Sequence, residues 1–297
     1  MFHKVVVANR SAVAARVLRA FDEMGIRSVA VYSEADAGAP YLERASETFA
    51  VGPAPARASY LKWMTAHDLI AEARAAKRAA LDELAGKQLL AGFGIAVPRS
   101  LVIPDAAGAV AACAKLNPPL VLKVVSPDIP HKSDVGGVYV GLRKAGEIEK
   151  AIRTMMLRPE IARARVDGFL LEEMAPAGQE IVIGGLRDPQ FGPLVMVGLG
   201  GVFVEVLADV SFRICPITRL DAEEMLDELK GAPLLRGARG RKPASRAAIV
   251  DALLKVGGEG GLLLTHADDI AEADINPLIV SEHGAVAVDA RFVLTKA

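Results

Sequence analysis

The stretch LKVVSPDIPHKSDVGG, from Leu122 to Gly137, decides how the rest of the chain is organised. Residues 120–125 are apolar except for Lys123, and an apolar run without alternation is typical of a strand that is covered on both faces. The lysine must reach a partner or the surface, because burying an unpaired ammonium group costs several kcal/mol. The Ser-Pro pair that follows ends the strand.

The loop after this strand combines His131 and Lys132 with the pair Gly136-Gly137. Glycines allow backbone N–H groups to approach an anion, and the two lysines of the stretch supply positive charge. The loop therefore predicts a phosphate site that contains an imidazole able to act as a nucleophile. A single histidine is, however, more often an ordinary surface or core residue, and a glycine pair is usually only a turn. From the loop alone, both interpretations stay open.

The composition argues against several classes of protein. Lys and Arg number 35 against 36 Asp and Glu, and aromatic residues make up 5% of the 297 residues, so no nucleic-acid or anionic membrane partner is indicated. The cysteines Cys113 and Cys215 form no metal or redox motif, which favours a reducing compartment. No signal peptide is recognisable, and no apolar stretch approaches the ~18 residues of a membrane span. The sequence predicts a cytoplasmic protein of about two or three domains.

The first sixty or so residues predict a small parallel, Rossmann-like α/β unit. Strands are expected at 4–7, 27–32 and 48–51, with a helix that has Ser11 as its N-cap and ends at Gly25. The first turn has no glycine, which disfavours a dinucleotide site. The runs FHKVVVANRSAVAARVLRAFDEMGIRSVAVYSEAD and VGPAPARASYL resemble the N-terminal domain of biotin carboxylases. This resemblance implies a scaffold over residues 1–61, without activity of its own.

The middle of the chain predicts alternating helices and strands. Residues 66–90 are expected to be helical, broken near Asp82 or Gly86, and residues 62–92 are expected to form a connector. A strand at 169–171 runs into Glu172-Glu173-Met174, and Glu180 follows after a turn. These acids could cap a neighbouring helix, or they could hold ribose hydroxyls beside a strand whose backbone faces an adenine. Both interpretations stay open. Further helices are expected at 106–116 and 146–157, and a strand at 137–142.

The last two strands carry the most informative geometry. Residues 275–280 and 285–294 flank a four-residue loop, and symmetric pairing would place Asn276 opposite Asp289 and Asp274 opposite Arg291. An amide oxygen and a carboxylate at cross-strand distance could share one Mg²⁺, or they could simply form a hydrogen-bonded pair beside a salt bridge. Pro277 lacks a ladder donor, so its strand should be an edge strand or bulged there.

Residues 66–297 as a whole resemble the ATP-grasp β subunit of NDP-forming acyl-CoA synthetases, the ADP-forming acetate–CoA ligase group. The matching runs, in one order, are VLKVVSPDIPHKSDVGGV, LLEEMAPAGQEIVIGGLRDPQFGPLVMVGLGGVFVEVLADVSFR, APLLRGARG and INPLIV followed by AVAVDARFVL. The resemblance implies an α+β ATP-grasp domain over residues 93–297, with its nucleotide site between lobes at about 93–167 and 168–297.

The same resemblance implies a role for each candidate residue. ATP or ADP with Mg²⁺ would be bound, and a phosphoryl group would pass through a histidine. The implied roles are phosphate contacts for Lys123, with Lys132, Gly136 and Gly137 offsetting charge; adenosine contacts for Glu172 or Glu173, Met174 and Glu180; Mg²⁺ ligands Asn276 and Asp289; phosphoryl carrier His131; and an acid beside it, Asp274.

The resemblance also implies a partner. A CoA-binding α subunit would complete a hetero-oligomer that uses CoA and a small carboxylate, although a homo-oligomer stays open. The alternatives are a non-catalytic module that binds ATP or ADP for regulation and, less expected, a biotin-carboxylase-related ligase, because the glycine-rich loop that those enzymes fold over ATP is absent.

Overall fold

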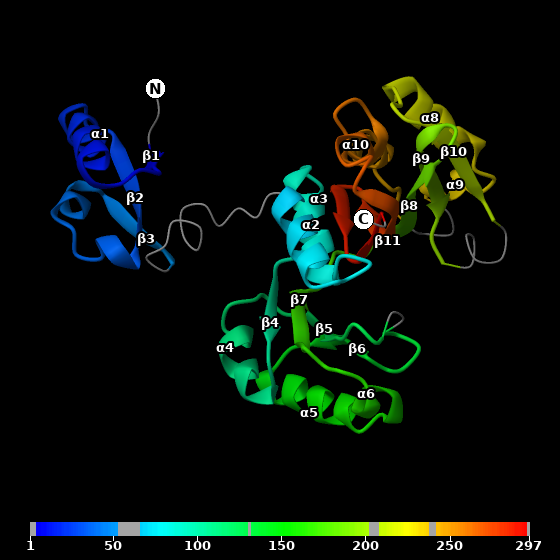
Figure 1. Cartoon of the computed structure of the whole chain (residues 1–297), viewed down its shortest axis with the longest axis horizontal. Helices are drawn as coiled ribbons and strands as arrows, with labels where there is room; N and C mark the ends of the chain where they lie inside the picture. Colours follow the sequence, from blue (N-terminus) through cyan, green and yellow to red (C-terminus); the bar gives the residue numbers. More distant parts are fainter. Residues whose placement is uncertain (1–3, 53–65, 130–131, 202–207, 238–241, 296–297) are drawn as a thin grey trace. The chain divides into compact units, whose positions relative to one another are not determined.

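The computed structural model describes residues 4–52, 66–129, 132–201, 208–237 and 242–295. The chain divides into two compact units, Met1–Thr65 and Ala66–Ala297 (Figure 1). Within the described ranges, no helix combines the length and the apolar character that crossing a membrane requires.

The N-terminal unit is the expected parallel sheet, with strand order β1-β2-β3. One core joins the sheet to its crossover helix through Ala14, Leu18 and Ala30. The helix begins at Ser11 rather than after it, and Arg10 is its N-cap, without a side-chain hydrogen bond. The predicted N-cap was therefore wrong by one residue. The elements are β1 (Lys4–Val7), α1 (Ser11–Glu23), β2 (Arg27–Ser33), η1 (Glu34–Asp36), η2 (Pro40–Arg44) and β3 (Glu47–Gly52).

The C-terminal unit opens with two helices, α2 (Ala66–Ala75) and α3 (Glu83–Gly92). The helical stretch is broken where the sequence predicted, because Asp82 caps α3 by accepting a hydrogen bond from the N–H of Ala85 at 2.9 Å. Apolar residues of both helices belong to the same core as the larger sheet of this unit. The stretch expected to be a connector thus supplies part of that core.

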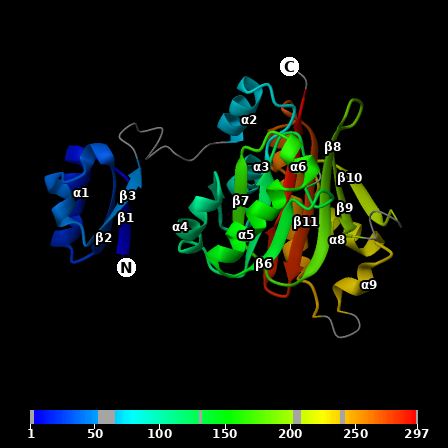
Figure 2. The ribbon, with the colours of Figure 1, turned by 90° about the horizontal axis from the view of Figure 1, so that it is seen from below.

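The smaller sheet of this unit is antiparallel, with strand order β4-β7-β5-β6. Leu120, Leu122 and Val124 of its strand β5 are buried against α4, α5 and α6, which confirms the predicted strand. Figures 1 and 2 show α5 and α6 on the face of this sheet that points away from the larger sheet. The expected helix at 106–116 is shorter and begins as a 3₁₀ turn. The elements are β4 (Ser100–Ile103), η4 (Ala106–Gly108), α4 (Ala109–Cys113), β5 (Leu120–Val125), β6 (Val138–Leu142), α5 (Ala145–Met156), α6 (Pro159–Arg163) and β7 (Gly168–Glu173).

The larger sheet is also antiparallel, in the order β10-β9-β8-β11-β12, and β13 pairs with β11 as well. Its core includes residues of α2, α3, α8, α10 and α11. The small parallel unit and the two-sheet α+β unit together confirm the predicted fold class. The elements are β8 (Gln179–Asp188), β9 (Gly192–Leu199), β10 (Val210–Ile214), α8 (Arg219–Glu228), α9 (Ala232–Leu235), α10 (Arg246–Gly257), α11 (Leu262–Thr265), β11 (Ile270–Ser281), β12 (Gly284–Ala287) and β13 (Ala290–Leu294).

The C-terminal hairpin has the predicted register. Asp274 pairs with Arg291, and the N–H of Asn276 donates to the carbonyl oxygen of Asp289 at 3.3 Å. Its turn is tighter than expected, because Ser281 already pairs with Gly284. Strand β11 lies inside the sheet, and its register with β8 shifts between Ile275 and Leu278. The proline between them therefore marks a bulge and not an edge strand.

Helix α3 is held close to β13 at a glycine. A Cβ atom on Gly86 would lie 2.8 Å from the carbonyl oxygen of Ala290 and 3.3 Å from the ring of Phe292. A Cβ atom on Gly92, in the same helix, would meet nothing within 4 Å. The nearest atom is a backbone oxygen, which cannot move aside as the end of a flexible side chain could. The contact at Gly86 therefore fixes the position of α3 on this sheet.

We expect Gly86→Ala to destabilise the protein by about 1–3 kcal/mol, because the overpacking outweighs the better helix propensity of alanine. Gly92→Ala should be neutral or stabilising by up to about 1 kcal/mol. Urea unfolding of both variants measures the difference. Equal effects of the two substitutions would contradict the close contact.

Candidate active site

Lys123 is buried in β5 and is paired on several sides. Its Nζ atom donates to Glu83 Oε1 at 2.5 Å and to the carbonyl oxygen of Val288 at 2.7 Å, and it lies 2.9 Å from Glu172 Oε2. These partners come from α3, from the link between β12 and β13, and from β7. The buried ammonium group is therefore paired, as the sequence predicted, and its partners place it at the junction of the two sheets.

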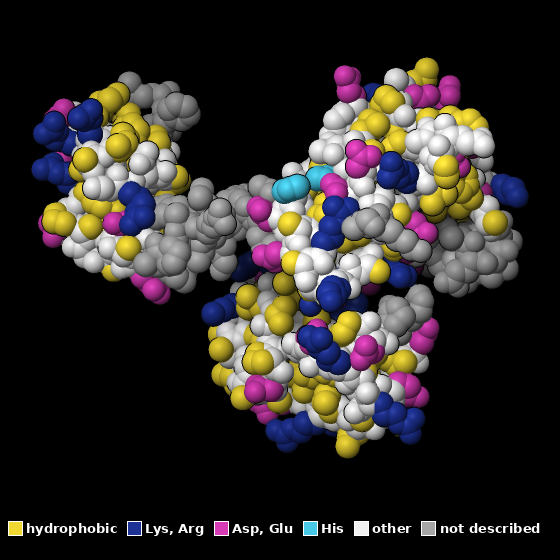
Figure 3. Space-filling view, in the orientation of Figure 1, with side chains coloured by type: hydrophobic (Ala, Val, Ile, Leu, Met, Phe, Trp, Pro, Cys, Tyr) yellow, Lys and Arg dark blue, Asp and Glu magenta, His cyan; other side chains and the backbone are white. Residues whose placement is uncertain are grey.

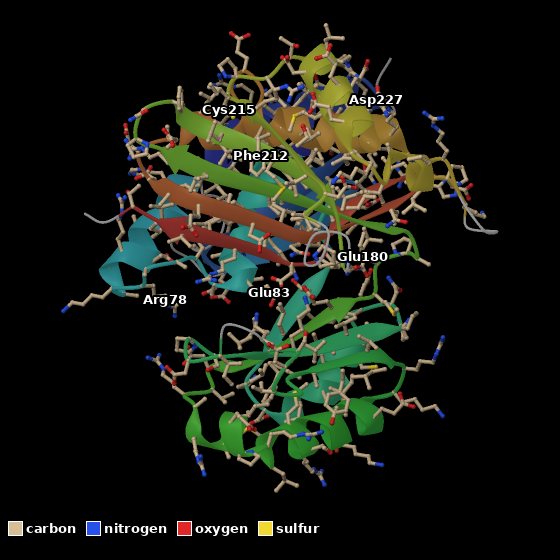
Figure 4. The ribbon with its side chains drawn as sticks, turned by 90° about the vertical axis from the view of Figure 1, so that its right-hand side faces the viewer. Arg78, Glu83, Glu180, Phe212, Cys215 and Asp227 are labelled. Carbon is tan, nitrogen blue, oxygen red and sulfur yellow. The ribbon has the colours of Figure 1, made fainter. Side chains whose placement is uncertain are left out.

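Glu83 receives three lysines on one carboxylate. Lys87 and Lys123 contact Oε1 at 2.8 Å and 2.5 Å, and Lys132 contacts Oε2 at 2.7 Å. The Glu83 side chain is 6% exposed. Lys87 also pairs with Glu172, and the side chains of both are 2% exposed. Figure 4 labels Glu83 between the larger and the smaller sheet. We call Glu83, Lys87, Lys123, Lys132 and Glu172 together the lysine cluster.

The lysine cluster carries three ammonium groups and two carboxylates, which leaves one positive charge. Burial alone would raise the pKa of Glu83, but the charges of Lys123, Lys87 and Lys132 outweigh it and lower this pKa to about 2. Burial would lower the pKa of Lys123, but Glu83, Glu172 and Asp289 raise it above its ordinary value. Burial lowers the pKa of Lys87, and the charge of Lys123 acts in the same direction. The cluster therefore keeps one excess positive charge at the junction of the two sheets.

The two adjacent acids of β7 point to different surroundings. Glu172 pairs with Lys87 and Lys123, so of the two acids predicted as alternatives for adenosine it is the one that lies inside the lysine cluster. Glu173 accepts hydrogen bonds from the N–H and Nδ2 of Asn117 at 3.0 and 2.9 Å. Alternation of side chains along a strand explains why neighbours in sequence separate in this way.

The remaining adenosine candidates lie at the end of β7 and the start of β8. The N–H of Met174 donates to the carbonyl oxygen of Pro119 at 2.9 Å. Glu180 is exposed, and its carbonyl oxygen accepts the N–H of Gly200 at 2.8 Å. A Cβ atom on Gly201 would lie 3.7 Å from Glu180 Oε2, which places this carboxylate beside the glycine turn. Figure 4 labels Glu180 at the junction of the sheets.

The amides of Gly136 and Gly137, predicted to contact phosphate, are hydrogen-bonded within their own turn. Their N–H groups donate to the carbonyl oxygens of Ser133 and Lys132, at 3.1 and 2.7 Å, within the same turn. A Cβ atom on Gly137 would lie 2.7 Å from the side chain of Val124, and Gly136 has a φ of +70°. The glycines serve the turn and its close packing. His131 lies outside the described residues.

The hairpin brings two carboxylates near each other. Although Asp274 is exposed to solvent, the protein around it partly desolvates its carboxyl group and raises its pKa; the charge of Asp289 adds to the rise, and Arg291 opposes it. Asp289 Oδ1 accepts the N–H of Ala290 at 2.8 Å. The described residues contain no group of three or more His, Cys, Asp or Glu side chains suited to a metal ion. Mg²⁺ often takes only one or two carboxylates and completes its shell with water and phosphate, so the predicted ligands Asn276 and Asp289 have a chemistry that fits it.

Figure 3 shows Lys and Arg side chains on the surface around the junction of the two sheets, whereas Lys87, Lys123 and Glu172 are buried. Sequence reasoning missed Glu83 and Lys87, which are four residues apart on α3. The available signal was an acid and a lysine on a helix otherwise rich in apolar residues.

From the low pKa of Glu83 we predict how the free energy of unfolding changes with pH. Unfolding returns this pKa to about 4.3, so the stabilisation is complete above about pH 4.5 and is lost as the pH falls toward 2. Glu83→Gln should lower the free energy of unfolding at pH 7 by about 3 kcal/mol, and the difference from wild type should shrink between pH 5 and pH 2. Urea unfolding across this range measures it, with the exposed Glu72→Gln as control. A difference that stays constant with pH would contradict the buried ion pairs.

Two family models match the chain. Residues 72–294 match the ATP-grasp domain, and residues 1–81 match the N-terminal domain of biotin carboxylase. The β subunit of the ADP-forming acetate–CoA ligase I of Pyrococcus furiosus is 44% identical over 231 residues, which are 77% of this chain and 97% of that subunit. The ADP-forming acetate–CoA ligase I of Archaeoglobus fulgidus is 45% identical over 211 residues, which are 70% of this chain and 30% of that longer protein.

A solved structure agrees with these sequence matches. The dinucleotide-forming acetyl-coenzyme A synthetase 1 of Ca. Korarchaeum cryptofilum, in complex with coenzyme A and Mg-AMPPCP and with its phosphohistidine segment pointing towards the nucleotide binding site, is 42% identical. The match covers 78% of this chain and 100% of that chain, with a TM-score of 0.67. The chain therefore belongs to the ATP-grasp family of β subunits of ADP-forming acetate–CoA ligases.

Proposed function

We propose that this chain is the nucleotide-binding subunit of an ADP-forming acyl-CoA synthetase and transfers a phosphoryl group between ATP or ADP and His131. One observation carries the proposal: three lysine ammonium groups converge at the junction of the sheets, where Lys123 also contacts the hairpin that bears Asp274 and Asp289. Positioning and charge stabilisation supply most of the catalysis of phosphoryl transfer.

In this proposal, Lys123 and Lys132 hold the phosphates of the nucleotide. Asn276 and Asp289 hold Mg²⁺, which when bound offsets phosphate charge. Glu180, with the backbone at Met174, contacts the ribose and the adenine, because its carboxylate is exposed and lies beside a glycine turn. Glu172 has a different role, as part of the lysine cluster.

His131 is the proposed phosphoryl carrier. A histidine imidazolium ordinarily loses its proton with a pKa of about 6.5, and the neutral imidazole that remains is a competent nucleophile near neutral pH. Its ring nitrogen attacks the γ-phosphorus of ATP, a P–N bond forms, and the bond to the bridging oxygen breaks so that ADP leaves. ATP synthesis runs through the reverse step. Asp274, on the hairpin, fixes the tautomer and stabilises the charged imidazole.

We further propose a CoA-binding α partner. The chain spans almost all of a relative that is named a β subunit but only 30% of a single-chain ligase. CoA and a small carboxylate would be substrates of the complex. A module that binds nucleotide without turnover is the second candidate, and it is favoured by the N-terminal unit, which matches a family model other than the ATP-grasp one.

Labelling tests the carrier. Incubation with γ-labelled ATP and Mg²⁺ should give an acid-labile, base-stable label that is lost in His131→Ala. His283→Ala, at the exposed turn of the hairpin, should keep it. Binding of ATP without any label, with a partner subunit present, would favour the regulatory module.

The metal ligands make a separate prediction. Asp289→Asn should raise the Mg²⁺ concentration for half-maximal labelling by about tenfold, because a carboxylate ligand of the ion is lost. Asp251→Asn on α10, which also removes one carboxylate, is the control and should not change it. A Mg²⁺ dependence that is the same in both variants would exclude Asp289 as a ligand.

A further inference from the structure

The Glu83 carboxylate occupies the place where three lysines would hold another anion. Both of its oxygens are used, since Oε1 accepts from Lys87 and Lys123 and Oε2 accepts from Lys132. Charge-assisted contacts of this kind are also how proteins hold a phosphate. A bound phosphate and the Glu83 carboxylate would therefore compete for the same ammonium groups.

The competing groups come from different parts of the C-terminal unit. Glu83 and Lys87 lie on α3, which the contact at Gly86 fixes on the larger sheet. Lys123 lies in β5 of the smaller sheet, and Lys132 lies in the loop that follows it. The ion pairs of Glu83 with Lys123 and Lys132 thus join a helix packed on the larger sheet to the smaller sheet and its loop.

We propose that Glu83 is an internal competitor of the nucleotide: it holds Lys123 and Lys132 in the nucleotide-free protein and yields them to a phosphate group when the nucleotide binds. This inference rests on the proposed function, because its ligand is the nucleotide of that site. Glu83 acts on the phosphates through the two lysines and is a positioning residue.

The surroundings of Glu83 allow this exchange. A carboxylate that lost all its partners in a buried place would be costly, but Lys87, on the same helix, stays beside Glu83 when its contacts with Lys123 and Lys132 break. Lys123 retains Glu172 and the carbonyl oxygen of Val288. The pKa of about 2 keeps Glu83 ionised and able to compete at any physiological pH.

The exchange lowers the binding affinity only of ligands that carry phosphate. A nucleotide must break two ion pairs of Glu83 before its phosphates reach the lysines, so Glu83 weakens the binding of ADP and ATP. Adenosine has no phosphate, so it binds without breaking these ion pairs. In return, Glu83 keeps three neighbouring ammonium groups from repelling one another in the free protein.

Calorimetric titration of the full chain with adenosine, ADP and ATP in the presence of Mg²⁺ tests the inference. Glu83→Gln should bind ADP and ATP about tenfold more tightly than wild type, since one charged competitor is removed, and should bind adenosine equally. Glu72→Gln removes the same charge from the exposed side of the neighbouring helix and should change nothing. Should Glu83→Gln fail to fold by circular dichroism, Glu83→Asp replaces it and should tighten ADP several-fold, because its shorter side chain withdraws from Lys132.

Weaker binding of ADP and ATP by Glu83→Gln would overturn the inference and would mean that Glu83 orients the lysines for phosphate. An equal gain for adenosine would overturn it too. A wild-type chain that binds none of the three ligands would overturn the proposed function together with the inference.

Discussion

One buried lysine sets the arrangement of the C-terminal unit. An ammonium group inside β5 is tolerated only if it is paired, and Lys123 finds its partners on α3, on β7 and at the link after β12. No single element of the smaller sheet could supply all of these. Glu172 of the neighbouring strand β7 supplies one partner, and the contacts to Glu83 and Val288 join α3 and the C-terminal hairpin to the smaller sheet, which is the geometry of the proposed anion site.

The same requirement explains why the charged groups come from distant parts of the sequence. Glu83 precedes Lys123 by forty residues, and Val288 follows it by 165. Both contacts join one core to the other, since α3 and the hairpin belong to the apolar cluster of the larger sheet and β5 belongs to that of the smaller sheet. Two separate cores thus hold charged side chains against each other. In our proposal, a bound phosphate replaces some of the contacts between these side chains.

Much of this could be predicted from sequence where the pattern is local. The register of the hairpin follows from a loop that is symmetric between Glu282 and His283, so Asp274 opposite Arg291 was predictable, and the tighter turn at Ser281 and Gly284 keeps the same centre. The ion pairs of Glu83 and Lys87 were not, because an acid and a lysine at i and i+4 on a helix normally face solvent. The same holds for the glycine pair: only the three-dimensional turn shows that the amides of Gly136 and Gly137 are already bonded.

The most direct measurement is a crystal structure of the chain with Mg²⁺ and ADP. Our account predicts a phosphate oxygen within hydrogen-bond distance of both Lys123 Nζ and Lys132 Nζ, with Glu83 turned away from Lys132 and still paired with Lys87. Asn276 and Asp289 should contact the metal ion. An ADP whose phosphates lie elsewhere, over a lysine cluster that keeps every contact described above, would contradict it.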